Sequence, residues 1–141
     1  MLVTNHLNLV GGAHDIRIVG DAFLWQRPFH TLMPEPTFEP HVQDEASRHW
    51  RMKNWGVPYE PLNVELLDAF ERSLAIEFTT IGTEPSGLLR YLARQYPSLT
   101  GVCQFMADTH SIHNSGVVKL ANGKTFARTY SKPNDIYKEY A

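Results

Sequence analysis

The 141-residue chain has one cysteine, Cys103, so neither an internal disulfide nor a four-thiolate cluster can form within it. Its formal net charge is −2 and it has no basic run, which argues against nucleic-acid binding because phosphate contacts need clustered Lys and Arg. It also has no apolar run of membrane-spanning length and no signal-peptide pattern in its first residues. We therefore expect a cytosolic protein that neither binds a membrane nor holds a cofactor.

What the chain does have is an ordinary globular composition, with 43% hydrophobic and 20% charged residues. A domain of this length buries roughly 65–70% of the surface that its unfolded chain exposes, so it needs no disulfide or metal for stability. No internal repeat or low-complexity segment divides the chain. We therefore expect one domain over residues 1–141.

Two periodicities recur along the chain. Apolar and polar residues alternate over residues 3–10, with Asn5 as the exception, and this alternation predicts a first strand. Apolar residues at helical spacing predict helices at 13–24 and 83–96, and Thr83 is the expected N-cap of the second helix. Gly20 weakens the first of these helices by about 1 kcal/mol of propensity.

The remaining strand-like runs predict two hairpins and one further strand. Residues 64–70 fit either a helix or a strand, and residues 74–80 alternate clearly, so a hairpin of the two that turns at 71–73 is the preferred interpretation. Residues 100–107 predict the next strand. Asn122-Gly123 predicts a second hairpin between 114–120 and 125–130, because both central residues of such a turn need a positive φ. Residues 131–141 are expected to form a polar tail.

Residues 26–61 contain six of the nine prolines and are too short to build a core of their own, so we interpret them as an insertion. Residues 29–33 are expected to be a short extended piece. Residues 33–36 should also be extended, because each proline fixes its own φ and biases its predecessor. Residues 44–53 predict a short helix, with acidic residues near its positive end and basic residues near its negative end.

The order strand, helix, strand, strand, helix, strand is the ferredoxin-like βαββαβ pattern. We therefore predict an α+β fold, in which two helices cover one face of an antiparallel sheet. The proline-rich insertion and an extra C-terminal β-hairpin would be added to that core.

Residues 49–58 hold two of the three tryptophans, Trp50 and Trp55, together with Arg51 and Lys53. The tryptophans are five residues apart, so neither one helical face nor one strand face presents both. One interpretation is a core anchor that pins the long connection to the sheet, with the indole N–H satisfied by a partner. The other is a binding surface, because Trp and Arg dominate interface hot spots.

Several segments of the chain resemble one family. Asn5-His6-Leu7-Asn8-Leu9-Val10-Gly11 resembles its opening Asn-x-Leu-x-Ile-x-Gly strand, and Met33-Pro34-Glu35-Pro36 resembles its Met-Pro-x-Pro segment. Trp50 with Lys53-Asn54-Trp55-Gly56 is similar to its central Trp-x-x-x-Asn-Trp-Gly signature. Glu84-Pro85, followed by residues 88–99 with Tyr96-Pro97-Ser98-Leu99, resembles its second helix and Phe/Tyr-Pro-x-Leu exit. Over roughly residues 4 to 123 the chain thus resembles the Api-ninety-two-like family.

The resemblance implies a ferredoxin-like domain, a phage, plasmid or other mobile-element origin, and hence a bacterial host cytosol. It implies no established activity. Two segments depart from the family pattern. Ile81-Gly82-Thr83 stands where members have a Trp-Ser type pair, and residues 108–115 form a histidine-bearing loop where members have a Pro-Gly-rich turn.

Few residues suggest chemistry. Asp108, His110 and His113 could reach a common metal ion, but we interpret them as a solvated polar loop; a small metal-dependent enzyme using His110 and His113 is an alternative. Cys103 is interpreted as an inert buried thiol. A second alternative is a nucleic-acid-binding module of the RNA-recognition type, in which aromatic residues such as Phe105 on an open sheet face would stack on bases.

Our leading hypothesis is a non-enzymatic accessory protein of a phage or mobile element that binds a bacterial host protein. Inhibition of a host defence system would be one form of that role, by analogy with other small phage proteins. The expected partner-binding residues are Trp50, Arg51, Lys53, Trp55, Tyr130, Tyr137 and Tyr140.

Overall fold

The fold is built on one antiparallel sheet. The computed structural model describes residues 1–108 and 115–129, and the backbone of residues 138–139. The strands lie in the order β2-β3-β1-β4-β5-β6-β7, and every neighbouring pair is antiparallel. Six of them form the main sheet, and the two-residue β7 adds to β6. The strands are β1 (Leu2–Val10), β2 (Leu62–Ala69), β3 (Ser73–Ile81), β4 (Thr100–Ala107), β5 (Gly116–Ala121), β6 (Lys124–Thr129) and β7 (Lys138–Glu139).

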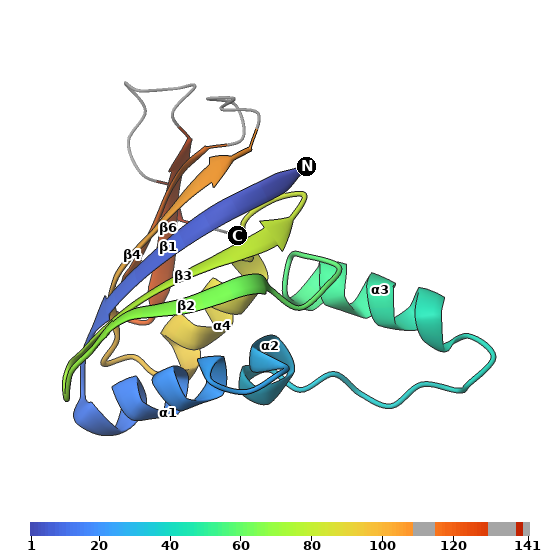
Figure 1. The fold of residues 1–141 in the computed structure, drawn as a ribbon, viewed down its shortest axis with the longest axis horizontal. Coiled ribbons are helices and arrows are strands. Elements are labelled where there is room, and N and C mark those ends of the chain that lie inside the picture. The colour runs from blue at the N-terminus through green and yellow to red at the C-terminus, as the bar shows by residue number, and fades with distance from the viewer. Residues whose placement is uncertain (109–114, 130–137, 140–141) are drawn as a thin grey trace.

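The helices lie on one side of this sheet (Figure 1). They are α1 (Ala13–Phe23), α2 (Pro28–Leu32), α3 (Gln43–Asn54) and α4 (Ser86–Gln95). The chain enters α1 from β1 and α4 from β3, while α2 and α3 belong to the connection between α1 and β2. In Figure 1, α1, α2 and α4 lie beneath the strands and α3 projects to one side. The predicted α+β fold, with an antiparallel sheet and helices on one face, is therefore confirmed.

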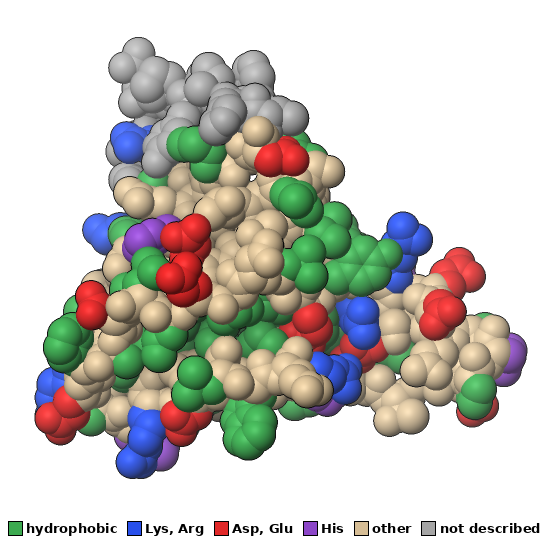
Figure 2. Space-filling view, in the orientation of Figure 1, with side chains coloured by type: hydrophobic (Ala, Val, Ile, Leu, Met, Phe, Trp, Pro, Cys, Tyr) green, Lys and Arg blue, Asp and Glu red, His purple; other side chains and the backbone are tan. Residues whose placement is uncertain are grey.

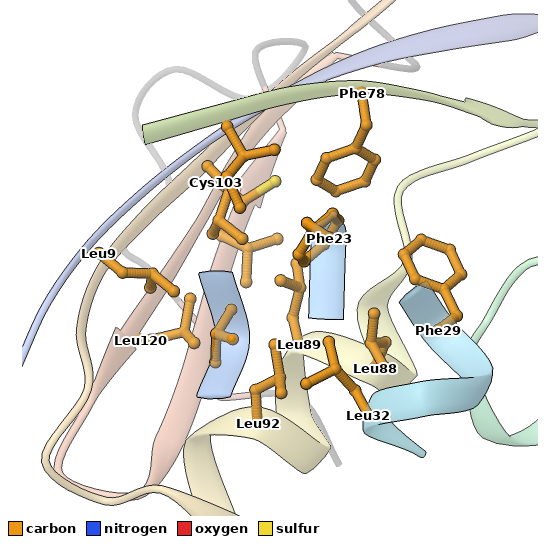
Figure 3. Close-up of a cluster of buried hydrophobic side chains, with 14 of the residues drawn as sticks. Leu9, Phe23, Phe29, Leu32, Phe78, Leu88, Leu89, Leu92, Cys103 and Leu120 are labelled. Atoms are coloured by element: carbon orange, nitrogen blue, oxygen red, sulfur yellow. The ribbon is translucent and has the colours of Figure 1, made fainter. Parts of the chain in front are cut away.

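The alternation along β1 positions the core. Val3, Leu7 and Leu9 are buried against the helix layer, and β1 is held on both sides, by β3 and by β4. The apolar stripe of α4 faces the same core, with Leu88, Leu89 and Leu92 at most 1% exposed. Figure 3 shows these leucines packed with Phe23, Phe29 and Phe78 between the helices and the sheet.

Asn5, the exception in the β1 alternation, is a buried polar residue with its hydrogen bonds made. Its side-chain amide donates to the carbonyl oxygens of Val3, at 3.2 Å, and Phe78, at 3.3 Å, and to the hydroxyl of Thr80, at 2.8 Å. These bonds offset the cost of removing the amide from water. The side chain thus reaches from β1 to β3, inside the core.

Cys103 lies on the same buried face and is 0% exposed. Burial raises the pKa of its thiol well above the ordinary value, and the nearby Glu84 carboxylate adds to the shift. A thiol held protonated in this way is not a nucleophile at neutral pH. The interpretation of Cys103 as an inert core residue is therefore confirmed.

Most of the expected elements are present, and three details differ. The hairpin at 71–73, the α3 helix and the Asn122-Gly123 turn are confirmed, the last with φ values of 56° and 76°. Residues 29–33 are not extended, because most of them belong to α2. Thr83 does not cap α4: that helix begins at Ser86, and the Thr83 hydroxyl bonds to the Glu84 carboxylate instead. Within the expected tail, residues 138–139 pair with β6.

Alanine substitutions at two helical glycines are expected to have opposite effects on stability. A methyl group on Gly87 would overlap the carbonyl oxygen of Asn54, whereas one on Gly20 would meet only the flexible side chain of Leu74, at 3.4 Å. We expect Gly87→Ala to lower the free energy of unfolding by about 1–3 kcal/mol through overpacking. Gly20→Ala should raise it by up to about 1 kcal/mol through helix propensity. Urea denaturation of both variants checks this, and a stabilised Gly87→Ala would contradict the close approach of α4 to the end of α3.

Candidate functional site

Trp55 lies at the centre of the signature segment and is 0% exposed. Its indole N–H donates to the carbonyl oxygen of Met33 at 3.0 Å. Its ring lies edge-to-face with Phe29, at 5.7 Å between centroids, and with Trp50, at 5.8 Å. The prediction that Trp55 contacts a partner is thus wrong for this structure, because a fully buried ring has no surface to offer. The alternative interpretation, a core anchor, is confirmed.

The two tryptophans contact each other, although their spacing places them on neither one helical face nor one strand face. Trp50 lies within α3, but the helix ends at Asn54, and Trp55 follows as its C-cap. The backbone N–H of Gly56 then bonds to the carbonyl oxygen of Arg51, at 3.0 Å, and Gly56 has φ of 88°. This turn ends α3 directly after Trp55, and the two rings meet edge-to-face.

Arg51 is engaged inside the protein. Its Nε donates to Glu35 at 2.7 Å, a second guanidinium nitrogen donates to the Pro58 carbonyl oxygen at 3.3 Å, and the guanidinium carbon lies 5.4 Å from the centre of the Trp55 ring. The Glu35 carboxylate also accepts a hydrogen bond from the Ser47 hydroxyl. Its side chain is 22% exposed and joins α3 to the connection between α1 and β2, which we call the connector. A contact between Arg51 and a partner stays a prediction.

The electrostatics of Glu35 follow from these contacts. Burial raises the pKa of the Glu35 carboxyl, but the hydrogen bonds from Ser47 and Arg51 and the positive charge of Arg51 outweigh it, so the net pKa is lowered. Glu35 is thus charged and paired at neutral pH. The pair stabilises the connector and has no reactive geometry of its own.

Of the other predicted contact residues, the structure describes two, both in α3. Lys53 is exposed on α3, and Trp50 is partly buried against Trp55. Tyr130, Tyr137 and Tyr140 lie outside the described residues, as do His110 and His113. Asp108 is exposed at the end of β4. Among the residues that the structure describes, no three His, Cys, Asp or Glu side chains are placed to hold a metal ion.

The face of the sheet opposite the helices gives little support to base stacking. Phe105, the aromatic residue named for that role, points into the core and is 4% exposed. Residues that alternate with the core side chains on β1, β3 and β4 include His6, Glu77 and Gln104, which lie side by side in the register. In these three strands the open face carries no aromatic side chain. The RNA-recognition alternative therefore lacks its stacking platform there.

A surface that the sequence analysis missed lies on β2 and the end of α1. Every residue of β2 is exposed, and several are large and apolar. Phe70, just after β2, is 67% exposed, and Trp25, just after α1, is 69% exposed. Figure 2 shows hydrophobic side chains at the surface in this part of the molecule. We call these residues the β2–α1 surface: Leu24, Trp25, Leu62, Val64, Leu66, Leu67 and Phe70.

A groove of about 430 Å³ runs between α1 and β2 within this surface. Leu24 lines it from α1, and Leu66, Ala69 and Phe70 line it from β2 and the residue that follows. The rim is polar and is formed by His14, Arg17, Asp21 and Glu71. An apolar floor with a polar rim is typical of a site that receives an apolar side chain.

β2 is also an edge strand, because β3 is its only neighbour among the strands that the structure describes. Its pairing with β3 shifts register between Leu62 and Glu65 and again between Leu66 and Asp68. Asn63, within the first shift, has a positive φ of 51°. Such bulges and charges are typical of edges that avoid uncontrolled pairing.

Comparisons with family models, with curated proteins and with solved structures each find no significant match to this chain. The resemblance to the Api-ninety-two-like family therefore stays a prediction. In the part of the chain that the structure describes, no helix has the length and apolar character needed to cross a bilayer.

The Glu35–Arg51 pair makes a pH-dependent prediction. Because the folded-state pKa of Glu35 is lowered, its stabilising effect is complete above the ordinary value of 4.5 and is lost as the pH falls through the folded-state pKa. Glu35→Gln should lower the free energy of unfolding by about 3 kcal/mol at pH 7, since it leaves Arg51 without its charged partner. The difference from the wild-type protein should shrink below pH 4.5.

Urea denaturation across this pH range measures the effect. Glu39→Gln is the matched control, because Glu39 is an exposed carboxylate of the same connector, and its effect should stay within about 0.5 kcal/mol. A Glu35→Gln penalty that is equally large at pH 7 and well below pH 4.5 would contradict the role of the ionised carboxylate.

Proposed function

We propose that this chain is a non-enzymatic protein-binding module and that the β2–α1 surface is where it binds its partner. The observation that carries the proposal is the set of exposed apolar side chains on β2 and at the end of α1, three of which, Leu24, Leu66 and Phe70, line the groove between these elements. Monomeric proteins rarely expose large apolar patches without a use for them, and aromatic side chains such as Trp25 and Phe70 supply most hot spots of interfaces.

The proposal extends to the fold family and the biological setting. A ferredoxin-like assignment for β1 to β4 with α1 and α4 is supported by the strand order β2-β3-β1-β4 and by its antiparallel pairs. The sequence resemblance supports an origin in a phage or mobile element, and hence a bacterial host protein as the partner. Inhibition of a host defence protein is the form of this role that the analogy with small phage proteins favours.

The surface proposed here replaces the tryptophan-rich segment as the main contact. Of the predicted residues, Lys53 is exposed and Trp50 is partly exposed, so they remain candidates for a secondary contact on α3. Trp55 and Arg51 act from inside, by holding the connector against the core. This division leaves the folding role and the binding role to different parts of the chain.

Capture of proteins from a bacterial lysate tests the proposal. The immobilised wild-type chain is compared with a Trp25→Ala/Phe70→Ala variant, which removes the two most exposed aromatic residues of the β2–α1 surface. We expect a captured host protein to bind the variant at least about tenfold more weakly, as the loss of a hot spot implies. The affinity is then measured with the purified partner.

A Val42→Ala/Met52→Ala variant is the control, because both residues are exposed and apolar but lie at or on α3. It should bind as the wild-type chain does. Circular dichroism establishes that both variants are folded. The proposed location is wrong if the wild-type chain and the Trp25→Ala/Phe70→Ala variant bind the partner equally. It is also wrong if only the Val42→Ala/Met52→Ala variant loses binding.

A further inference from the structure

We infer that β2 binds an extended segment of the partner as an added strand, and that the side chains of this segment alternate between apolar and basic. This inference rests on the proposed function and specifies the chemistry of its partner. Three features of β2 carry it: an unused backbone edge, an apolar groove on one side and an acidic row on the other.

The first feature is the backbone edge. Because β2 pairs only with β3 within residues 1–108, 115–129 and 138–139, alternate N–H and C=O groups along β2 point away from the described sheet, toward the side where another strand can add. An added strand bonds to those groups through its main chain, which gives affinity without dependence on its sequence. The two register shifts of β2 limit the regular pairing to a short segment.

The second feature lies on the helix side of β2. Leu66 is opposite Ile76 and Ala69 is opposite Leu74, so these β2 side chains face the same side as the buried residues of β3. Both line the α1–β2 groove. Every second side chain of an added strand would point to this side, over the groove, where an aliphatic group is removed from water.

The third feature lies on the other side of β2. Glu65 stands directly opposite Glu77 in the register, and Asp68 is opposite Ala75 on the same face. Like charges directly across a strand pair are destabilising. β2 and β3 contain no Lys or Arg, and no ion pair found among the described residues includes Glu65 or Glu77. A Lys or Arg on the added strand would lie beside Glu65 and Asp68 of β2, one strand away from Glu77, and its positive charge would offset the repulsion among these carboxylates.

The same charges argue against a second copy of this chain as the occupant. Two β2 strands paired with each other would bring two copies of Glu65 and of Asp68 onto one ladder. That arrangement adds like charges beside Glu65, which already faces Glu77 of β3. A basic strand from another protein has the complementary charge.

Labelled seven-residue peptides test the inference by fluorescence anisotropy at low salt. The probe alternates Val and Lys, and the matched peptide alternates Val and Glu. We expect the Lys peptide to bind about tenfold more tightly than the Glu peptide, as two cross-strand charge pairs imply. A Lys peptide with N-methyl groups on alternate backbone nitrogens keeps its charge but loses strand hydrogen bonds, so it should lose most of its binding.

Charge reversal locates the site. Glu65→Lys/Asp68→Lys should invert the preference between the two peptides. Glu39→Lys/Glu45→Lys changes the net charge equally, at exposed positions away from β2, and should leave the preference unchanged. Hydrogen exchange should show that the Lys peptide protects amides of β2.

Several results would overturn the inference: no binding of the Lys peptide up to about 1 mM, equal binding of the N-methylated peptide, an unchanged preference after charge reversal, or a dimer paired through β2. The proposed function is judged separately. If the Trp25→Ala/Phe70→Ala variant loses its host partner while the peptides do not discriminate, the β2–α1 surface binds protein without strand addition. If neither assay depends on these residues, both ideas are wrong.

Discussion

The hydrogen bond from the Trp55 indole to the Met33 carbonyl oxygen is the contact on which the arrangement of the connector depends. It joins the fully buried Trp55, at the end of α3, to the residue that follows α2, across 22 positions of sequence. Phe29 packs against Trp55 and also against Phe78 of β3. The backbone carbonyl of Trp55 accepts from the N–H of Leu88, in α4. Trp55 thus links the insertion to α4 through its backbone and, through Phe29, to the sheet.

This arrangement explains why the most conspicuous segment of the sequence is not the most exposed. Trp packs both in cores and at interfaces, and Arg forms both buried ion pairs and interface contacts. Composition therefore does not separate the two roles. What separates them here is the buried carboxylate of Glu35, 16 residues before Arg51, which takes up the guanidinium charge inside the protein.

Sequence patterns predicted those elements whose causes are local. The alternation of β1, the stripe of α4 and the Asn122-Gly123 turn each follow from neighbouring residues, and each is present. The α2 helix was missed because the hydrogen bonds at its N-terminus come from a residue distant in sequence. The backbone N–H groups of Phe29 and His30 donate to the carboxylate of Glu60, some thirty residues later. The one local signal was Pro28, which is favoured at the first position of a helix. The candidate surface was missed for a similar reason, since the exposure of β2 depends on where the insertion packs.

The acidic side chains of β2 and β3 can serve two purposes. An exposed apolar strand such as β2 invites pairing with any other edge, including that of a second copy, and charges and bulges reduce that tendency. Glu65 opposite Glu77 is a costly way to achieve this in an isolated domain, because the repulsion acts within the folded chain itself. The cost is offset only when a cation comes to lie between or beside the two carboxylates. The carboxylates of β2 and β3 weaken pairing with acidic or neutral strands and therefore favour pairing with basic strands. Protection from aggregation and choice of partner thus follow from the same side chains.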